Sequence, residues 1–258
     1  SKCHGGKDEL QLCSAPKVDL DKANNNCVEC HMPITGSADI PHVAIHDHYI
    51  RKPKEYIKEE GKLVGLKSIN GGENGDKELL KAYLTYFEKF DSKTFYSKQA
   101  DKYAKKVGVE EFNPLNVHYW YNKQNYKKVV SLAKEVDVNM VDNHFTAYQI
   151  AQSLYNELEY SQSLKWYNRS LSLKPLNIDY RIAKTQVLLE LNKAIEAQKE
   201  LDFIFKEQNK NSQAYYLRGI LMLQKGSRTR AKQNFIEVLK LNPDDQKAKA
   251  QLKSLAEL

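Results

Sequence analysis

The sequence has no cysteine after residue 30, no long apolar run and no phosphate-binding glycine loop. All four cysteines lie within the first 30 of 258 residues, which confines thiol chemistry to one end of the chain. No stretch approaches the roughly 20 consecutive apolar residues of a membrane-spanning helix, so no membrane span is expected. The glycines at 71, 72 and 75 precede no Gly-Lys-Ser/Thr, which excludes a phosphate loop at that point.

The charge of the chain is moderately basic. There are 40 Lys and Arg against 33 Asp and Glu, a net charge of +7, and 41% of the residues are hydrophobic. This composition predicts a folded protein that is long enough for two domains, or for one domain and a repeat array. The lysines are scattered and build no single basic stripe, so we expect no nucleic-acid partner. The charge suits an acidic protein partner or a solvated surface.

One short motif near the beginning carries specific chemistry. Cys27 and Cys30 are separated by two residues, and His31 follows directly. Cys-x-x-Cys-His is the attachment signature of a c-type haem, because two thiols bond to the porphyrin and the adjacent imidazole reaches the iron. Ser1-Lys2-Cys3-His4 looks like a second such motif without its leading cysteine. We therefore predict at least one haem c, and two or more in the intact protein, with Cys3 and His4 serving the second.

The opposite face of the iron needs another ligand. His42, His46 and His48 lie within seven residues. In a helix His42 and His46 share a face, whereas in an extended chain His46 and His48 do. Asp47 is suited to accept the outer ring N–H of a ligating histidine. A pair of histidine ligands gives a lower reduction potential than histidine with methionine.

Two other interpretations of these cysteines stay open. Cys27 and Cys30 complete a tetrahedral zinc site if two of the three downstream histidines join them. They also suit a disulfide without any cofactor. Cys13 fits no second motif and is interpreted as a buried thiol or a partner for Cys3.

A repeat of 34 residues runs through the second half of the chain. Pro175 and Pro243 are 68 residues apart, twice the tetratricopeptide (TPR) period. In this frame most apolar and small residues match in kind. The predicted units are 144–177, 178–211 and 212–245, here called the first, second and third repeats, with a degenerate unit at 110–143 and a capping helix at 246–258.

Each repeat is expected to be a pair of helices. Small residues permit close approach of the two helices, and larger side chains fill the gap to the next pair. The small residues in register are Ala151, Ala197, Gly219 and Ala231. A further helical hairpin is predicted at 79–90 and 95–105. We therefore expect a haem-binding segment at 1–75 and helical pairs at 76–258.

The same register places a set of side chains on the face where TPR arrays bind peptides. It is a polar and aromatic set, consisting of Tyr148, Gln152, Tyr155, Gln186, Tyr216 and Ile220. The set lacks the Lys/Asn clamp that a terminal carboxylate needs. The alternative is that these side chains are solvated or cover the preceding domain. For His118 and His144 we expect a structural role rather than metal ligation.

The motifs at the beginning of the chain resemble those of a known family. The runs 27–33 (CVECHMP), 39–42 (DIPH) and 47–53 (DHYIRKP) resemble multihaem cytochromes c that carry TPR repeats downstream. The chain looks like a C-terminal part of such a protein. The resemblance implies a mostly α fold, in which an irregular c-type haem-binding N-terminal segment is followed by a TPR helical solenoid.

The resemblance also assigns roles to the histidines. It implies that His31 is an axial ligand and that His42 and His48 complete the coordination of this haem or a neighbouring one. His46 ranks third, since the family more often has a non-ligand at that place.

The function predicted from the sequence is electron transfer. The repeats are expected to dock a redox protein or a membrane electron-transfer complex. The helical part contains no nucleophile or proton-transfer constellation, which favours a carrier over a catalyst. Covalent haem is attached outside the cytoplasm, so a periplasmic or cell-surface location is expected. The alternative function is a non-redox TPR scaffold that binds protein segments and has a zinc or disulfide N-terminal segment.

Overall fold

The computed structural model describes most of the chain beyond residue 74. The described residues are positions 18 and 21, the backbone of 34–36 and 44–46, and residues 65–66, 75–89 and 94–256. The chain divides into two units, Ser1–Leu63 and Val64–Leu258. The predicted boundary at residue 75 stays a prediction, because residues 67–74 lie outside the described part.

The first unit contains a short antiparallel pair of strands. β1 (Ile34–Gly36) pairs with β2 (Ala44–His46), and Ile34 lies opposite His46. The sequence predicts no strand here, because three residues are too few to show an alternating pattern. The backbone of His46 is thus extended, and the next residues along the chain lie outside the described part.

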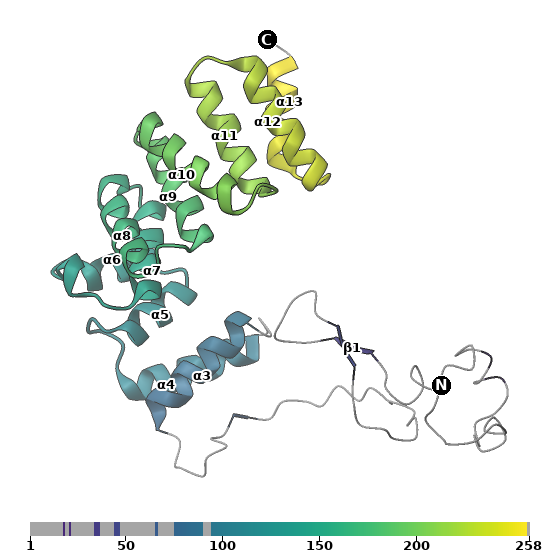
Figure 1. Cartoon of the computed structure of the whole chain (residues 1–258). Coiled ribbons are helices and arrows are strands. Elements are labelled where there is room, and N and C mark those ends of the chain that lie inside the picture. Colours follow the sequence, from purple (N-terminus) through teal and green to yellow (C-terminus); the bar gives the residue numbers. More distant parts are fainter. Residues whose placement is uncertain are drawn as a thin grey trace. The chain divides into compact units, whose positions relative to one another are not determined.

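The second unit is built from pairs of helices (Figure 1). The helices are α3 (Asp76–Lys89) and α4 (Thr94–Val107), α5 (Pro114–Asn122) and α6 (Tyr126–Ala133), α7 (His144–Asn156) and α8 (Tyr160–Leu173), α9 (Ile178–Glu190) and α10 (Ala194–Glu207), α11 (Ser212–Gln224) and α12 (Arg228–Leu241), and finally α13 (Gln246–Ala256). A 3-10 turn, η2 (Val138–Met140), lies between α6 and α7.

The helices follow the predicted period. First helices begin at residues 144, 178 and 212, and the last helix begins at 246, so that the spacing is 34 residues. Second helices begin at 160, 194 and 228, with the same spacing. The predicted mostly α architecture with a TPR-type solenoid is confirmed for the described residues.

A repeated cap explains why each first helix begins where it does. The side chain of Asn177 accepts a hydrogen bond from the backbone N–H of Tyr180 at 2.9 Å, which satisfies one of the unpaired donors of the first turn. The same arrangement recurs at the start of α7, α11 and α13, with Asn143, Asn211 and Asp245 as the capping residues.

The turn inside each pair is also repeated. The second residue after each of α5, α7, α9 and α11 has a positive φ, which lets the chain reverse into the second helix. These residues are Gln124 (φ 54°), Leu158 (φ 64°), Asn192 (φ 56°) and Gly226 (φ 73°). Leucine is an unusual residue for this conformation, because its Cβ crowds the backbone there.

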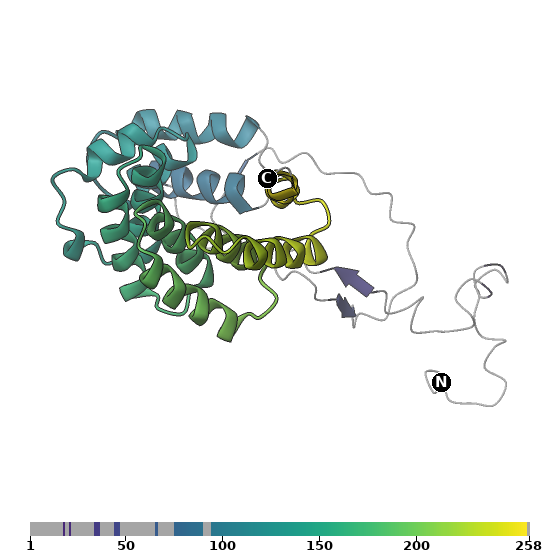
Figure 2. The ribbon, with the colours of Figure 1, turned by 90° about the horizontal axis from the view of Figure 1, so that it is seen from above.

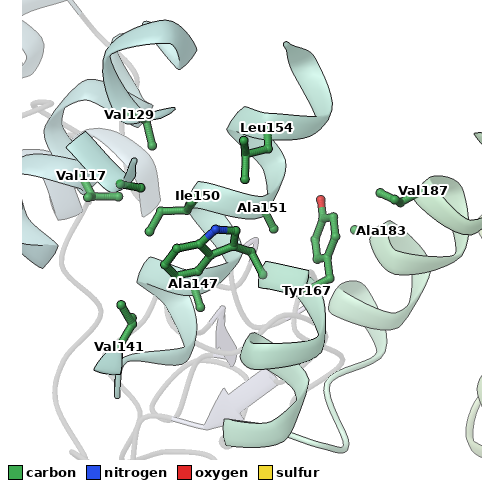
Figure 3. Packing of buried hydrophobic residues seen from close by; sticks show 12 residues of the cluster. Val117, Val129, Val141, Ala147, Ile150, Ala151, Leu154, Tyr167, Ala183 and Val187 are labelled. Carbon is green, nitrogen blue, oxygen red and sulfur yellow. The ribbon is translucent and has the colours of Figure 1, made fainter. Parts of the chain in front are cut away.

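The core lies between the two helices of a pair and the first helix of the next. Tyr167 of α8 is 1% exposed, and its ring lies between Ala151 of α7 and Ala183 of α9 (Figure 3). In the third repeat, Gly219 lies so close to Phe235 that a Cβ at this glycine would come within 2.5 Å of the ring. Small residues thus set how closely the helices approach.

Neighbouring pairs are joined in chain order (Figure 2). From α6 on, each second helix contacts the helix that follows it, as α8 contacts α9 and α10 contacts α11. The first helices also contact one another, α5 with α7, α7 with α9, and α9 with α11. They therefore form a continuous row along the array.

Among the described residues, no helix is both long and apolar enough to cross a membrane.

Candidate functional site

The predicted haem ligands fall in the first unit, and their side chains lie outside the described residues. They are Cys3, His4, Cys27, Cys30, His31, His42, His46 and His48. Their roles stay predictions. In the part of the chain that the structure describes, no group of three His, Cys, Asp or Glu side chains is arranged to hold a metal ion.

Both histidines of the helical unit make packing contacts. His118 Nε2 lies 3.0 Å from Glu88 Oε2, which joins α5 to α3. His144 Nδ1 lies 2.8 Å from the Tyr180 hydroxyl. Burial lowers the pKa of His144, and the nearby Lys174 lowers it further. These contacts agree with the structural role expected from the sequence.

The predicted binding residues all lie on the row of first helices. Tyr148, Gln152 and Tyr155 are on α7, Gln186 is on α9 and Tyr216 is on α11, and each is partly exposed. Residues three and four apart share one face of a helix. We call the surface formed by these and neighbouring residues the first-helix face. It consists of positions 118, 121 and 122 of α5, 145, 148, 152, 155 and 156 of α7, 179, 182, 186, 189 and 190 of α9, and 213, 216, 220, 223 and 224 of α11.

An aromatic cluster connects three helices of this face. The ring of Tyr148 stacks on Tyr180 of α9 at 4.6 Å and 16°, and lies nearly parallel to Phe145 at 6.2 Å. Phe145 in turn meets the ring of His118 on α5 edge to face at 5.7 Å. Aromatic pairs at such distances add to the stabilisation from burial. The central part of the face is therefore held by ring contacts between α5, α7 and α9.

Hydrogen bonds fix the same side chains. The hydroxyl of Tyr167 donates to Gln152 Oε1 at 2.6 Å, and the hydroxyls of Tyr121 and Tyr148 are hydrogen-bonded to each other. Burial raises the pKa of Tyr121 and of Tyr148. Burial also raises the pKa of Tyr180 to about 12. These phenols stay neutral near pH 7 and remain able to donate hydrogen bonds.

The far end of the face is tied to its neighbours as well. Gln224 Nε2 of α11 donates to the backbone carbonyl of Leu189 on α9 at 3.0 Å. Tyr216 packs against Phe235 of α12 at 5.6 Å and is hydrogen-bonded to Gln251 of α13. The face thus continues from α5 to α11 through direct contacts.

The cations of α9 are engaged away from this face. Arg181 and Lys184 both pair with Glu200 of α10, with 2.7 Å between Lys184 Nζ and Glu200 Oε1. The guanidinium of Arg181 also lies 3.6 Å from the centre of the Phe203 ring. Both cations are therefore ion-paired within the second repeat, where they share one carboxylate.

Sequence reasoning did not single out four residues of this site, three of them on the first-helix face and one, Tyr180, next to Asp179 on α9. Phe145 and Tyr180 complete the aromatic cluster, and Asp179 and Glu190 supply charge at the two ends of α9. By the 34-residue period Asp179 is equivalent to Phe145, and Glu190 to Asn156, so comparing the repeats position by position identifies these two charges.

Comparison with known proteins supports the fold. No protein-family profile matches the chain, and no curated protein matches it. Among solved structures, the chain is similar to YrrB, described as a TPR protein with an unusual peptide-binding site, with 13% identity and a TM-score of 0.52 over 69% of this chain and 91% of that chain. It also matches the TPR domain of Arabidopsis OM64 (21% identity, TM-score 0.42, 44% and 94% of the two chains) and MamA of MSR-1 (16%, 0.46, 60% and 84%). At these identities, the likeness to YrrB shows a TPR-type fold and no more.

Proposed function

We propose that the helical repeats bind a segment of another protein on the first-helix face. The observation that carries this proposal is the aromatic cluster around Tyr148, which is contributed by three helices and is partly exposed. Aromatic side chains supply large contact areas at little entropic cost, and they are enriched where proteins bind one another. The hydrogen-bonded hydroxyls hold these rings in place before any partner arrives, which lowers the cost of binding.

The absence of cations from the face narrows the kind of segment. Capture of a terminal carboxylate needs a lysine or arginine on the binding face. None of the first-helix face positions is Lys or Arg. An internal segment of a partner therefore suits the face better than a free C-terminus. YrrB, a solved structure with the same type of fold, is described as having an unusual peptide-binding site.

Site-specific photocrosslinking tests this function. A photoreactive amino acid at Gln152 or Gln186, both partly exposed on first helices, is expected to crosslink a partner in cells that make the protein. The same amino acid at Gln162 of α8 or Lys199 of α10, which are exposed on second helices, serves as the control. Equal crosslinking at all four positions, or none at the first two, would contradict the proposal.

A second function is proposed from the sequence of the first unit. Cys27 and Cys30 supply the two thiols, and His31 the adjacent imidazole, that covalent haem c requires. Such a haem would supply reversible one-electron chemistry. The repeats would then dock a redox protein or a membrane electron-transfer complex, and the location would be periplasmic or at the cell surface. Without haem, the non-redox scaffold with a zinc or disulfide segment is the remaining alternative.

Visible spectroscopy separates these two proposals. Protein made with haem-attachment machinery is expected to show sharp c-type bands on reduction, and mass spectrometry should find the added covalent mass. Changing Cys27 and Cys30 to Ser should remove one haem. A colourless wild-type protein would contradict electron transfer and would leave the protein-binding proposal untouched.

A further inference from the structure

The first-helix face is acidic in a basic chain. The chain carries 40 Lys and Arg against 33 Asp and Glu, but the only formally charged residues on the face are Asp179 and Glu190. Both are exposed. Within the described part of the chain, neither has a salt-bridge partner, whereas Glu200 on α10 has two. The face thus presents unpaired negative charge.

Each of these carboxylates acts electrostatically on tyrosines of the first helices. Burial raises the pKa of Tyr155 on α7, and the charge of Glu190 on α9 raises it further. In the same way, Asp179 adds to the effect of burial on Tyr148 and Tyr180. The ring centres of Tyr148 and Tyr180 are 4.6 Å apart. Tyrosines and exposed carboxylates therefore occur together towards both ends of α9.

The charge of Glu190 gains nothing from the dipole of its own helix. It is the last residue of α9, where the partial negative charge of the helix end disfavours a carboxylate. Asp179 lies in the first turn of α9, where a carboxylate stabilises the helix. Of the two, Glu190 is therefore the residue whose charge the fold does not explain.

We infer that the first-helix face binds a protein segment carrying lysine or arginine, whose cationic groups pair with Asp179 and Glu190 and lie against Tyr148 and Tyr155. This inference rests on the proposed protein-binding function and specifies its partner. A cation over a tyrosine ring is attracted by the ring, and an adjacent carboxylate adds Coulomb attraction. Arg181 over Phe203, paired with Glu200, shows the same combination inside the second repeat.

The geometry also predicts the spacing of the cations. Tyr148 and Tyr155 are seven residues apart on α7, which corresponds to about 10 Å along the helix axis, and Asp179 and Glu190 are separated by about 16 Å on α9. An extended chain advances about 3.3 Å per residue. The two cationic residues of the partner should therefore be roughly three to five residues apart.

Charge also distinguishes this partner from other occupants. The first 75 residues of this chain have nearly equal numbers of acidic and basic side chains, so as a whole they carry no net positive charge, although residues 51–54 form one short basic run. An acidic segment would meet only repulsion from Asp179 and Glu190. A basic segment of another protein is the occupant that fits.

Peptide binding to the full chain tests the inference. The probe is a fluorescent Gly/Ser peptide with two arginines about four residues apart, and its counterpart has glutamate in place of arginine. We expect the arginine peptide to bind, with an affinity that falls as salt is raised. Changing Asp179 to Asn together with Glu190 to Gln should weaken binding by roughly tenfold. Because Asp179 contributes to the start of α9, thermal unfolding of each variant accompanies the binding measurement.

A matched variant controls for net charge. Glu159 and Glu207 are exposed, lie off the first-helix face and have no ion pair in the described part. Changing both to Gln removes the same charge and should leave binding unchanged. Equal weakening by the two double variants would overturn the inference. Tight binding of the arginine peptide with the same affinity for the wild type and the Asp179/Glu190 variant would overturn it too.

Three other outcomes would also overturn it. NMR chemical-shift changes of backbone amides locate the bound peptide on the chain. If such changes occur in α7 and α9 with the glutamate peptide alone, they contradict a basic partner but still support the protein-binding function. No shifts in these helices with either peptide would count against both proposals. If the chain self-associates and the Asp179/Glu190 variant abolishes this, the occupant is a second copy rather than a basic segment of another protein.

Discussion

The first and second repeats fill the same internal position with opposite chemistry. In the first repeat, Ile150 and Trp166 are both buried within one apolar cluster. Thirty-four residues later the same positions hold Lys184 and Glu200, which pair at 2.7 Å. The backbone tolerates both, since the helices begin in the same register. The period therefore determines where helices lie, while the chemistry of each contact is chosen separately.

The third repeat uses yet another combination. Arg218 and Asn234 occupy these positions, with 2.6 Å between Arg218 Nε and Asn234 Oδ1. The guanidinium of Arg218 also lies 4.2 Å from the centre of the Phe205 ring. Polar side chains thus replace apolar ones in the second and third repeats. The stability of these two repeats is therefore more sensitive to the loss of a single interaction partner.

The largest effect is expected from removing Glu200. Glu200→Ala leaves Arg181 and Lys184 without their shared carboxylate, and both side chains are less than a fifth exposed. We expect a loss of about 2–4 kcal/mol in the free energy of unfolding, measured by urea denaturation. Introducing the first-repeat pair, Lys184→Ile with Glu200→Trp, should recover at least half of this loss. A change within experimental error for Glu200→Ala would show that these ion pairs contribute nothing measurable to the free energy of unfolding.

The next effect compares one position between the first and third repeats. Ala151 is accommodated in the first repeat, whereas a Cβ at Gly219 in the third would come within 2.5 Å of Phe235. Gly219→Ala should therefore destabilise the protein by about 1–3 kcal/mol, read from thermal unfolding. Phe235→Leu makes room, so this second substitution should cost less when Gly219→Ala is already present than in the wild type. Additive losses would contradict the steric explanation.

A smaller effect should distinguish first from second helices. The side-chain oxygen of Asn177 accepts the hydrogen bond that Tyr180 N–H donates at the start of α9, whereas Ser227 before α12 makes no side-chain cap bond. Asn177→Ala should cost about 1 kcal/mol and Ser227→Ala less than half of that, as determined by chemical denaturation. Similar losses at both positions would show that the repeated asparagine cap is not what starts the first helices.

The smallest effect concerns the turn residues. Leu158 has φ 64° and is 70% exposed, whereas Gly226 occupies the equivalent turn of the third repeat. Leu158→Gly should raise the free energy of unfolding by about 0.5–1 kcal/mol, because it removes backbone strain and loses little burial. The converse change, Gly226→Leu, should lower it by a similar amount. A destabilised Leu158→Gly protein would indicate that this leucine makes contacts that offset its strain.

The architecture was predictable because repetition multiplies a weak signal. One proline proves little, but Pro175 and Pro243 in register with small and apolar residues predicted the helical pairs that the structure shows. The caps at Asn143, Asn177 and Asn211 repeat with the same period and were equally readable. The two three-residue strands of the first unit belong to no repeated sequence pattern, so the sequence did not predict them.

The candidate site was predictable only in part. Register placed Tyr148, Gln152 and Tyr155 on one helix, but it did not show that Tyr148 stacks on Tyr180. Which charges neutralise one another depends on side-chain directions in the folded state. The sequence alone does not reveal that Glu200 pairs with both Arg181 and Lys184, whereas Glu190 has no ion pair among the described residues.

The row of contacts between adjacent first helices has a mechanical consequence. Because α7 contacts α9 and α9 contacts α11, we expect neighbouring helical pairs to separate from one another one at a time. A ligand that contacts both α7 and α9 would hold the first and second repeats together. Amide hydrogen exchange in these two helices would then slow on binding, while exchange in α12 and α13 would stay at its rate in the free protein.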